Sequence, residues 1–305
     1  MCVTCGCSDD NDAKVSNLET GTVTSIDVNG HNHYHDHHTH TLPDGTVITH
    51  SHSHDHSHQT ASHLHAKIHG TTISLEQDIL AKNNLIAAQN RGWFKGRNIL
   101  ALNLMSSPGA GKTTLLTRTI NDLKTQLNIS VIEGDQETIN DAKKIQETGC
   151  KVVQINTGTG CHLDAVMLEK GLQQLNPPLD SVVMIENVGN LVCPALFDLG
   201  ENLKVVILSV TEGEDKPIKY PHMFRASEVM VLTKIDLLPY VQFDVQKCIE
   251  YAQQVNPQIQ IFQVSALTGT GLENWYKWLT QNREQGIENS YLTDNCTDAI
   301  NRVSS

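Results

Sequence analysis

The stretch that decides the fold is residues 99–114, ILALNLMSSPGAGKTT. Residues 99–105 form an apolar run that predicts a buried strand, and a helical pattern follows at 113–127. Between them, Ser106 to Thr113 fits the phosphate-binding pattern G-x-x-x-x-G-K-[ST], except that serine replaces the first glycine. A chance glycine-rich turn is the alternative, but the order strand, loop, helix favours a nucleotide-binding loop.

The loop is expected to hold phosphates mainly through its backbone. Its N–H groups would surround phosphate oxygens, with the positive end of the following helix behind them. Lys112 would contact the β- and γ-phosphates, and the hydroxyl of Thr113 would bind Mg²⁺. The residues expected to bind nucleotide here are Gly109, Ala110, Gly111, Lys112, Thr113 and Thr114.

Two short motifs further along the chain indicate which base is bound. TKID, residues 233–236, resembles the guanine-recognition motif NKxD with threonine for asparagine. The Asp236 carboxylate can accept hydrogen bonds from guanine N1–H and the exocyclic amine, a pair of donors that adenine lacks. Lys234 would pack along the base, and SAL, which begins with Ser265 and Ala266, would offer a backbone N–H to the guanine oxygen. Their order after the loop favours GTP over ATP.

The segment VVMIENVGN carries candidate hydrolysis residues. It resembles the switch motif D-x-x-G with Glu186 in the acidic position, and the Gly189 amide is expected to sense the γ-phosphate. Glu186 and Asp135 are candidates for holding Mg²⁺ or positioning water, and with Lys112 they form the expected catalytic set. For Asp135, an N-cap of a helix at 136–148 is the alternative, and both roles can hold.

Apolar runs alternate with helical patterns through residues 73–285. Strands are expected at 99–105, 129–133, 151–155, 181–186, 203–209, 228–233 and 259–264, and helices at 113–127, 136–148, 162–175, 243–255 and 271–283. Apolar strands that alternate with helices predict an α/β fold, a mostly parallel sheet flanked by helices, as in P-loop GTPases. The first helix is expected to begin near Ser74.

The rest of the chain differs in composition. Among 305 residues, 22 are Lys or Arg and 34 are Asp or Glu, and the net charge of −12 argues against a nucleic-acid or membrane surface. Residues 1–72 are rich in Cys and His and are expected to be largely disordered, and the polar tail 286–305 is expected to be frayed. The sequence has neither a membrane-length apolar run nor a secretory signal, so a cytoplasmic location is expected.

Soft metal ligands are concentrated in the N-terminal region. Cys2, Cys5 and Cys7 could wrap one ion, and thiolate ligands suit Ni²⁺ or Zn²⁺. A structural zinc knuckle is the alternative, but no second ligand pair follows at the usual spacing. Fourteen of the 16 His lie between His31 and His69. This tract is expected to store exchangeable metal, or to act only as a solubilising segment.

A second candidate metal site lies within the nucleotide-binding part of the chain. Cys161 and His162 are adjacent, and Cys193 comes four residues after Gly189, in the segment expected to move with the γ-phosphate. The alternative is that these cysteines are small buried hydrophobes. Three ligands leave a first-row ion incompletely ligated, so a symmetric dimer that shares ions is expected.

Together and in order, MCVTCGC, the His-rich stretch, SSPGAGKTT, GTGCHLD, ENVGNLVCP and TKID resemble the HypB family, the nickel-incorporation GTPases of hydrogenase maturation. The resemblance covers almost the whole chain. It implies a SIMIBI-class GTPase that forms a homodimer with GTP and delivers nickel to the [NiFe]-hydrogenase large subunit. A small nickel chaperone of the HypA type is the implied partner. The implied metal ligands are Cys2, Cys5 and Cys7 in a high-affinity nickel motif, and Cys161, His162 and Cys193 in the GTPase domain.

The leading prediction is a GTP-hydrolysing metallochaperone that stores and delivers nickel. A urease-type nickel-insertion GTPase ranks second, because a Cys-Pro-His motif is expected there in place of Cys161–His162. A metal-storage protein with an incidental nucleotide domain is a third possibility. A P-loop kinase is disfavoured by TKID and SAL.

Overall fold

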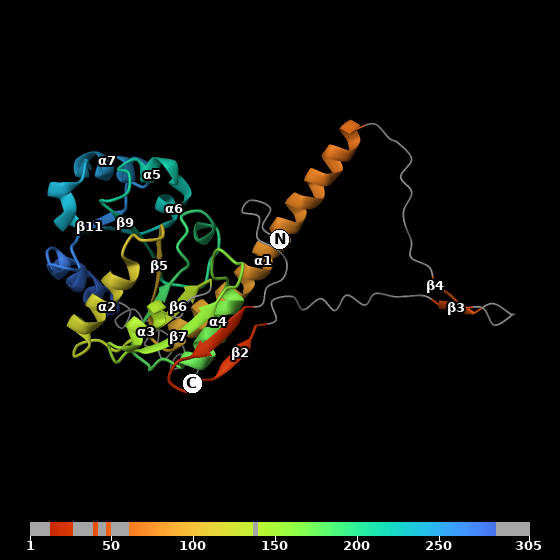
Figure 1. The fold of residues 1–305 in the computed structure, drawn as a ribbon, viewed down its shortest axis with the longest axis horizontal. Coiled ribbons are helices and arrows are strands. Elements are labelled where there is room, and N and C mark those ends of the chain that lie inside the picture. The colour runs from red at the N-terminus through yellow and green to blue at the C-terminus, as the bar shows by residue number, and fades with distance from the viewer. Residues whose placement is uncertain (1–12, 27–38, 42–46, 50–60, 137–139, 285–305) are drawn as a thin grey trace, which may run out of the picture.

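The computed structural model describes residues 13–26, 39–41, 47–49, 61–136 and 140–284. A nine-stranded sheet forms its centre, in the order β11-β10-β9-β5-β8-β6-β7-β1-β2 (Figure 1). The seven strands from β5 to β11 run parallel, and β1 and β2 are antiparallel additions at one edge. The predicted α/β class with a mostly parallel sheet is therefore confirmed.

The strands of this sheet begin and end as follows: β1 Lys14–Asn17, β2 Val23–Ser25, β5 Leu100–Ser106, β6 Ile129–Asp135, β7 Lys151–Asn156, β8 Val182–Glu186, β9 Leu203–Ser209, β10 Val229–Thr233 and β11 Gln260–Gln263. A separate antiparallel pair joins β3 Thr39–Thr41 and β4 Val47–Thr49. Each predicted strand from 99–105 to 259–264 corresponds to one of the parallel strands.

The helices are α1 Ala61–Gly96, α2 Lys112–Leu123, α3 Asn140–Gln146, α4 Ala165–Leu175, α5 Lys216–Lys219, α6 Pro221–Ala226 and α7 Val245–Val255, with 3-10 turns η1 Cys193–Ala195 and η2 Ile235–Tyr240. Residues 272–284 are also helical. Short α5 and α6 were not expected. They lie between β9 and β10, where prolines open both helices.

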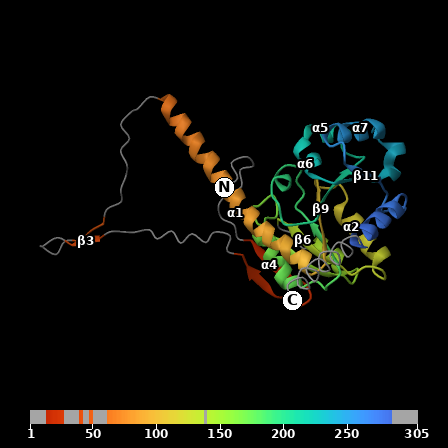
Figure 2. The same ribbon diagram turned by 180° about the vertical axis from the view of Figure 1, so that it is seen from behind.

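Two helical layers cover the sheet because successive side chains of each strand point to opposite faces. Leu100, Leu102 and Leu104 of β5 pack with α2, α3 and the helix at 272–284. Ala101 belongs to the opposite face, where α1 and α4 pack, and α6 and α7 continue that layer over β9 and β10. Figure 2 shows α1 and α4 side by side, with the N-terminal half of α1 extending beyond the sheet.

The structure differs from the expectation that order begins near Ser74. β1 pairs with β7, and Ala13, Val15 and Ile26 are buried against the α1 and α4 side of the sheet. Tertiary pairing rather than local propensity holds this short hairpin in place, and a period search cannot detect that. Ser74 lies inside α1, which contains no proline to interrupt its backbone hydrogen bonds.

No helix among the described residues is both long enough and apolar enough to cross a bilayer.

Candidate nucleotide and metal site

The phosphate-binding loop leaves the carboxyl end of β5 and enters α2, as predicted. Gly111 caps α2 in the left-handed region with φ 94°, a conformation that glycine adopts without a steric penalty. Lys112 Nζ donates a hydrogen bond to Ser106 Oγ at 3.0 Å. The serine that replaces the first glycine of the motif therefore contributes a hydroxyl that orients the loop lysine.

The TKID motif packs directly against this loop. The Thr233 hydroxyl donates to the Ala110 carbonyl at 2.6 Å, and Lys234 Nζ donates to the Gly109 carbonyl at 2.7 Å. Lys234 adopts φ 60°, which is uncommon for a residue with a Cβ and typical of functional positions. The half-buried Asp236 follows in η2. The structure thus brings the predicted base motif and the predicted phosphate motif together.

SAL lies after β11, beside α2. The Ser265 hydroxyl accepts a hydrogen bond from the Thr268 N–H at 3.1 Å, which tightens the turn. The carbonyl of Ala266 accepts a hydrogen bond from Arg118 of α2 at 3.0 Å. Arg118 is held in turn by Asp122 at 2.7 Å. The turn that was expected to face a base is therefore fastened to the helix that follows the phosphate loop.

Three carboxylates, which we call the acidic cluster, gather at the ends of neighbouring strands: Glu133, Asp135 and Glu186. Glu133 and Glu186 are register partners on β6 and β8, and Glu186 Oε1 accepts a hydrogen bond from the Thr113 hydroxyl at 2.7 Å. Burial raises the pKa of Glu133 to about 9, with a further contribution from the negative charge of Glu186. Burial also raises the pKa of Glu186, while Lys112 opposes that change.

The donor set of the acidic cluster fits a hard divalent cation. Glu133 Oε2 and Glu186 Oε2 are buried and have no hydrogen-bond partner within the described part of the chain. Mg²⁺ takes oxygen ligands of this kind, and one bound here would offset the repulsion between the carboxylates. Glu133 was not among the predicted site residues. Its signal was a carboxylate at the end of an otherwise apolar strand.

Asp135 is the last residue of β6, and its carbonyl accepts a hydrogen bond from Thr157 N at 2.9 Å. The predicted helix start at Gln136 is wrong, because Asp135 ends a strand and Gln136 is not helical, so Asp135 does not cap a helix there. Asp135 nevertheless lies close enough to the other two carboxylates to raise their pKa values through its charge. Asp135 therefore lies near Glu186, the other carboxylate that was predicted to hold Mg²⁺.

The segment after β8 lies between the phosphate loop and Cys161, one of the predicted metal ligands. A Cβ on Gly189 would lie 3.1 Å from the Pro108 ring, so this segment packs closely against the phosphate loop. Asn190 Nδ2 donates to the carbonyl of Cys161 at 3.3 Å. Within two residues the chain thus contacts both the nucleotide side and the metal side of the site.

The predicted ligands Cys161, His162 and Cys193 come together, and we call them the Cys–His–Cys site. One ligand atom from each lies within 4.8 Å of the other two, and Cys161 Sγ is 3.6 Å from His162 Nδ1. Two sulfurs bonded to one ion at about 2.3 Å each are separated by at most about 4.6 Å. Only a small adjustment is therefore needed for one ion to contact all three residues.

Local packing determines the protonation state of the imidazole in the Cys–His–Cys site. The His162 ring stacks on Phe197, with ring centroids 3.9 Å apart. Burial lowers the pKa of His162 to about 4, so the ring is neutral near pH 7, as a metal ligand must be. α4 begins just beyond this residue because Asp164 Oδ1 accepts a hydrogen bond from Met167 N at 2.7 Å. The predicted helix at 162–175 therefore begins three residues late, and both ligands lie in the preceding loop.

The predicted ligands Cys2, Cys5 and Cys7 lie outside the described residues. β1 fixes where their segment joins the sheet, because Lys14 is the register partner of Asn156 at the carboxyl end of β7.

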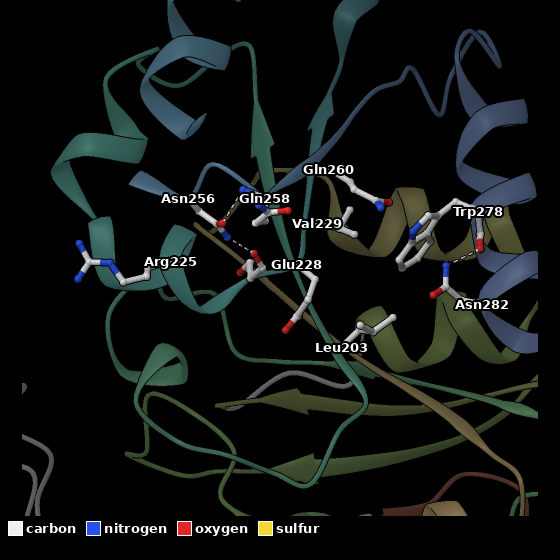
Figure 3. A pocket seen from close by; sticks show the side chains of 10 residues that line it. Leu203, Arg225, Glu228, Val229, Asn256, Gln258, Gln260, Trp278 and Asn282 are labelled. Carbon is white, nitrogen blue, oxygen red and sulfur yellow. Dashed lines mark hydrogen bonds between the residues drawn. The ribbon is translucent and has the colours of Figure 1, made fainter. Parts of the chain in front are cut away.

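A cavity lies at the opposite end of the sheet (Figure 3). Its volume is ≈ 420 Å³, and Leu203, Val229 and Gln260, which line it, begin or adjoin the amino ends of β9, β10 and β11. In parallel α/β sheets, ligands bind outside the carboxyl ends of the strands. This cavity is therefore separate from the nucleotide and metal residues.

Comparisons with known proteins agree with this geometry. The family model for the nucleotide-binding domain of CobW/HypB/UreG matches residues 100–263. The hydrogenase maturation factor HypB of Rhizobium leguminosarum bv. viciae is 59% identical over 207 residues, which are 68% of this chain and 69% of that protein. HypB of Escherichia coli strain K12 is 53% identical over 227 residues, 74% of this chain and 78% of that protein.

Solved structures of similar proteins cover the same region. The crystal structure of HypB from Archaeoglobus fulgidus has a TM-score of 0.63 and 38% identity, and covers 67% of this chain and 100% of that chain. The structure of HypB from Helicobacter pylori in complex with nickel has a TM-score of 0.63 and 36% identity, and covers 67% and 96%. With its phosphate loop, TKID motif and Cys–His–Cys site in one assembly, the chain belongs to the HypB family of hydrogenase maturation factors.

Proposed function

We propose that the chain hydrolyses GTP and uses the nucleotide state to control the binding and release of nickel for [NiFe]-hydrogenase maturation. The observation that carries the proposal is the short connection between two sites. Gly189 packs on the phosphate loop, while Asn190 donates a hydrogen bond to the carbonyl of Cys161. A nucleotide site and a soft-ligand site that share one segment are suited to a switch.

Lys112 binds the β- and γ-phosphates of GTP and stabilises the charge that develops in the transition state. The Thr113 hydroxyl and the acidic cluster hold Mg²⁺, which neutralises phosphate charge when bound. Asp236 accepts hydrogen bonds from guanine, while Lys234 covers the base. The remaining nucleotide contacts come from the backbone N–H groups of the phosphate loop and SAL.

The Cys–His–Cys site holds nickel as cargo, and zinc is the competing ion with the same preference for thiolate and imidazole. Three protein ligands leave one coordination position open, which allows transfer to an acceptor. The nickel complex reported for the Helicobacter pylori relative supports this assignment. A GTP-promoted homodimer that brings two such sites together would complete the ligand set.

The N-terminal region supplies nickel in this proposal. Cys2, Cys5 and Cys7 form a high-affinity site, and the His tract between His31 and His69 stores exchangeable ions. We propose a cytoplasmic location, a small nickel chaperone of the HypA type as exchange partner, and the hydrogenase large subunit as recipient.

The test measures GTP turnover, bound nickel and oligomer mass on one preparation of the full chain. Turnover that requires Mg²⁺, a preference for GTP over ATP, and a nickel affinity that differs between GDP and a non-hydrolysable GTP analogue are expected. Nickel binding with no GTP turnover would favour the storage alternative instead. Turnover with a nickel affinity that is equal in both nucleotide states would refute the switch.

A further inference from the structure

A chain of buried polar side chains crosses the sheet between the nucleotide site and the Cys–His–Cys site. Asn187, the residue after Glu186, donates from Nδ2 to Asn103 Oδ1 at 3.2 Å. Asn103, in the middle of β5, donates from Nδ2 to Glu201 Oε1 at 3.1 Å. We call these three residues, Asn187, Asn103 and Glu201, the relay. All three are less than one-tenth exposed.

One end of the relay holds backbone next to His162, and the other holds the loop that follows Cys193. Asn187 Oδ1 accepts a hydrogen bond from the N–H of Leu163, the neighbour of His162, at 3.1 Å. Glu201 Oε2 accepts one from the N–H of Leu199 at 2.8 Å, in the loop that begins at Cys193. The relay therefore fastens the two segments that supply the ligands of the Cys–His–Cys site.

The middle of the relay is continuous with the nucleotide site. Asn187 lies between Glu186, which accepts the Thr113 hydroxyl, and Gly189, which packs on the phosphate loop. Asn103 lies three residues before Ser106 on the strand that leads into that loop. A displacement of either element by the γ-phosphate would therefore move the side chain of Asn187 or Asn103.

Hydrogen-bond geometry makes the relay sensitive to small movements. Its two side-chain bonds, at 3.1 and 3.2 Å, are lost when they lengthen by more than about 0.4 Å. A buried amide that loses its hydrogen-bond partner is strongly disfavoured. The neighbouring backbone is therefore expected to shift so that the hydrogen bonds of the relay are kept. A well-packed apolar side chain would fill the place of Asn103 without needing any partner. These polar groups are therefore suited to coupling rather than to packing.

We propose that Asn103, Asn187 and Glu201 are positioning residues that transmit the nucleotide state to the Cys–His–Cys site. The inference rests on the proposed function, because it needs a nucleotide-dependent movement to transmit. The reacting phosphate and the bound metal are contacted by other residues.

A buried asparagine outside the relay provides a matched control. Asn90 of α1 donates from Nδ2 to the carbonyls of Ala165 and Leu199, at 2.9 and 3.0 Å. It fastens the same two metal-bearing segments from outside the sheet, by the same chemistry, and at similar burial. Its partners are on the metal side alone. Loss of Asn90 therefore tests whether loosening the segments around Ala165 and Leu199 is by itself enough to change the coupling between nucleotide state and nickel affinity.

The experiment uses the full chain with the cysteines outside the described residues changed: Cys2→Ser, Cys5→Ser, Cys7→Ser and Cys296→Ser. Ni²⁺ is titrated with GDP and with a non-hydrolysable GTP analogue. Thiolate-to-nickel charge-transfer absorption reports the Cys–His–Cys site, because imidazoles of the His tract lack sulfur. GTP turnover and nickel stoichiometry of the same background decide the proposed function independently.

Three variants are compared in that background: Asn103→Leu, Asn187→Asp and the control Asn90→Ala. Asn187→Asp keeps the two acceptor bonds to the N–H groups of Leu163 and Val188, replaces the donor to Asn103 by an acceptor, and adds a negative charge. It therefore decides the question if Asn103→Leu does not fold. Hydrogen exchange of residues 161–165 in the two nucleotide states gives a second readout that simple destabilisation does not change.

The background protein is expected to show at least about a fivefold difference in nickel affinity between nucleotide states. Both relay variants should reduce that ratio to about one and remove the nucleotide dependence of exchange at 161–165. Asn90→Ala should lower nickel affinity in both states and keep the ratio. The inference is overturned if the relay variants keep the background ratio, or if Asn90→Ala abolishes it equally. It is also overturned if the background ratio is one, while GTP turnover and nickel binding persist.

Discussion

Replacement of Gly200 by alanine is expected to separate α1 from the loop that follows Cys193. Gly200 has φ 92°, and a Cβ there would lie 2.3 Å from the Ala87 carbonyl oxygen and 2.8 Å from the Arg91 nitrogen. Both atoms belong to the backbone of α1, so they cannot turn aside as a side chain would. The helix must move, and the hydrogen bonds from Asn90 to Leu199 and Ala165 must lengthen with it.

Two costs combine in the expected loss of stability. A residue with a Cβ in the left-handed region costs about 1 kcal/mol, and extra atoms forced into a packed contact add about 1–3 kcal/mol. Gly200→Ala should therefore lower the free energy of unfolding by about 2–4 kcal/mol. Gly149 supplies the control, because it has φ 82° and no atom within 4 Å of the position of a Cβ. Gly149→Ala should lose only about 1 kcal/mol.

Thermal unfolding of the two variants, followed by circular dichroism, measures this difference. At about 2–4 °C per kcal/mol for a domain of this size, Gly200→Ala should melt at least about 2 °C below Gly149→Ala. Nickel affinity of the Cys–His–Cys site should fall in Gly200→Ala alone. Equal melting temperatures would refute the account of α1 as the element that fixes this loop.

Three further predictions concern the proposed chemistry. Lys112→Ala should reduce steady-state GTP hydrolysis at least about 100-fold with the circular dichroism spectrum unchanged, because it removes charge stabilisation of the transition state; near-normal turnover would contradict the phosphate-loop assignment. Asp236→Asn should shift competition for binding from GTP towards xanthosine triphosphate, since an amide replaces one acceptor by a donor, and an unchanged preference would make TKID a strand end only. In the metal-free folded chain at pH 8, iodoacetamide should label Cys161 well before Cys150 and Cys248. Burial raises the pKa of the Cys150 and Cys248 thiols to about 12, so very little of their reactive thiolate form is present at pH 8. Peptide mass mapping that finds all three cysteines labelled equally would contradict the burial of Cys150 and Cys248.

The fold of this chain was predictable from the sequence where the local residue pattern agrees with the tertiary structure. The parallel strands are apolar on both faces, and the phosphate loop has a fixed spacing, so both are visible in sequence. β1 is different, because Val15 is its one fully buried side chain and the strand exists by pairing with β7. A strand of this kind has almost no local signature, and the N-terminal region was expected to be disordered for that reason.

The candidate site shows a similar division. Residues recognised by motif, such as Lys112 and Asp236, were predictable because their chemistry requires a defined residue at a defined spacing. Asn103 and Glu133 were missed, although each is a polar residue in an otherwise apolar strand. Such a residue is costly to bury without a partner, and its presence in a strand is itself a signal. The identity of the partner depends on strand order, which follows only from the structure.

The strand order also explains why the two sites are inseparable. β8 lies between β5 and β6, so its carboxyl end meets both the phosphate loop and the acidic cluster. The chain leaves β8 at Glu186 and reaches Cys193 seven residues later, while Asn190 fastens it to Cys161 on the way. In the proposed function, a movement that alters nucleotide contacts at one end of this segment would alter metal contacts at the other. By linkage, nickel binding then changes the affinity for GTP by the same factor with which GTP changes the affinity for nickel. Nucleotide affinity measured with and without nickel therefore gives an independent value for the coupling that the relay is proposed to carry.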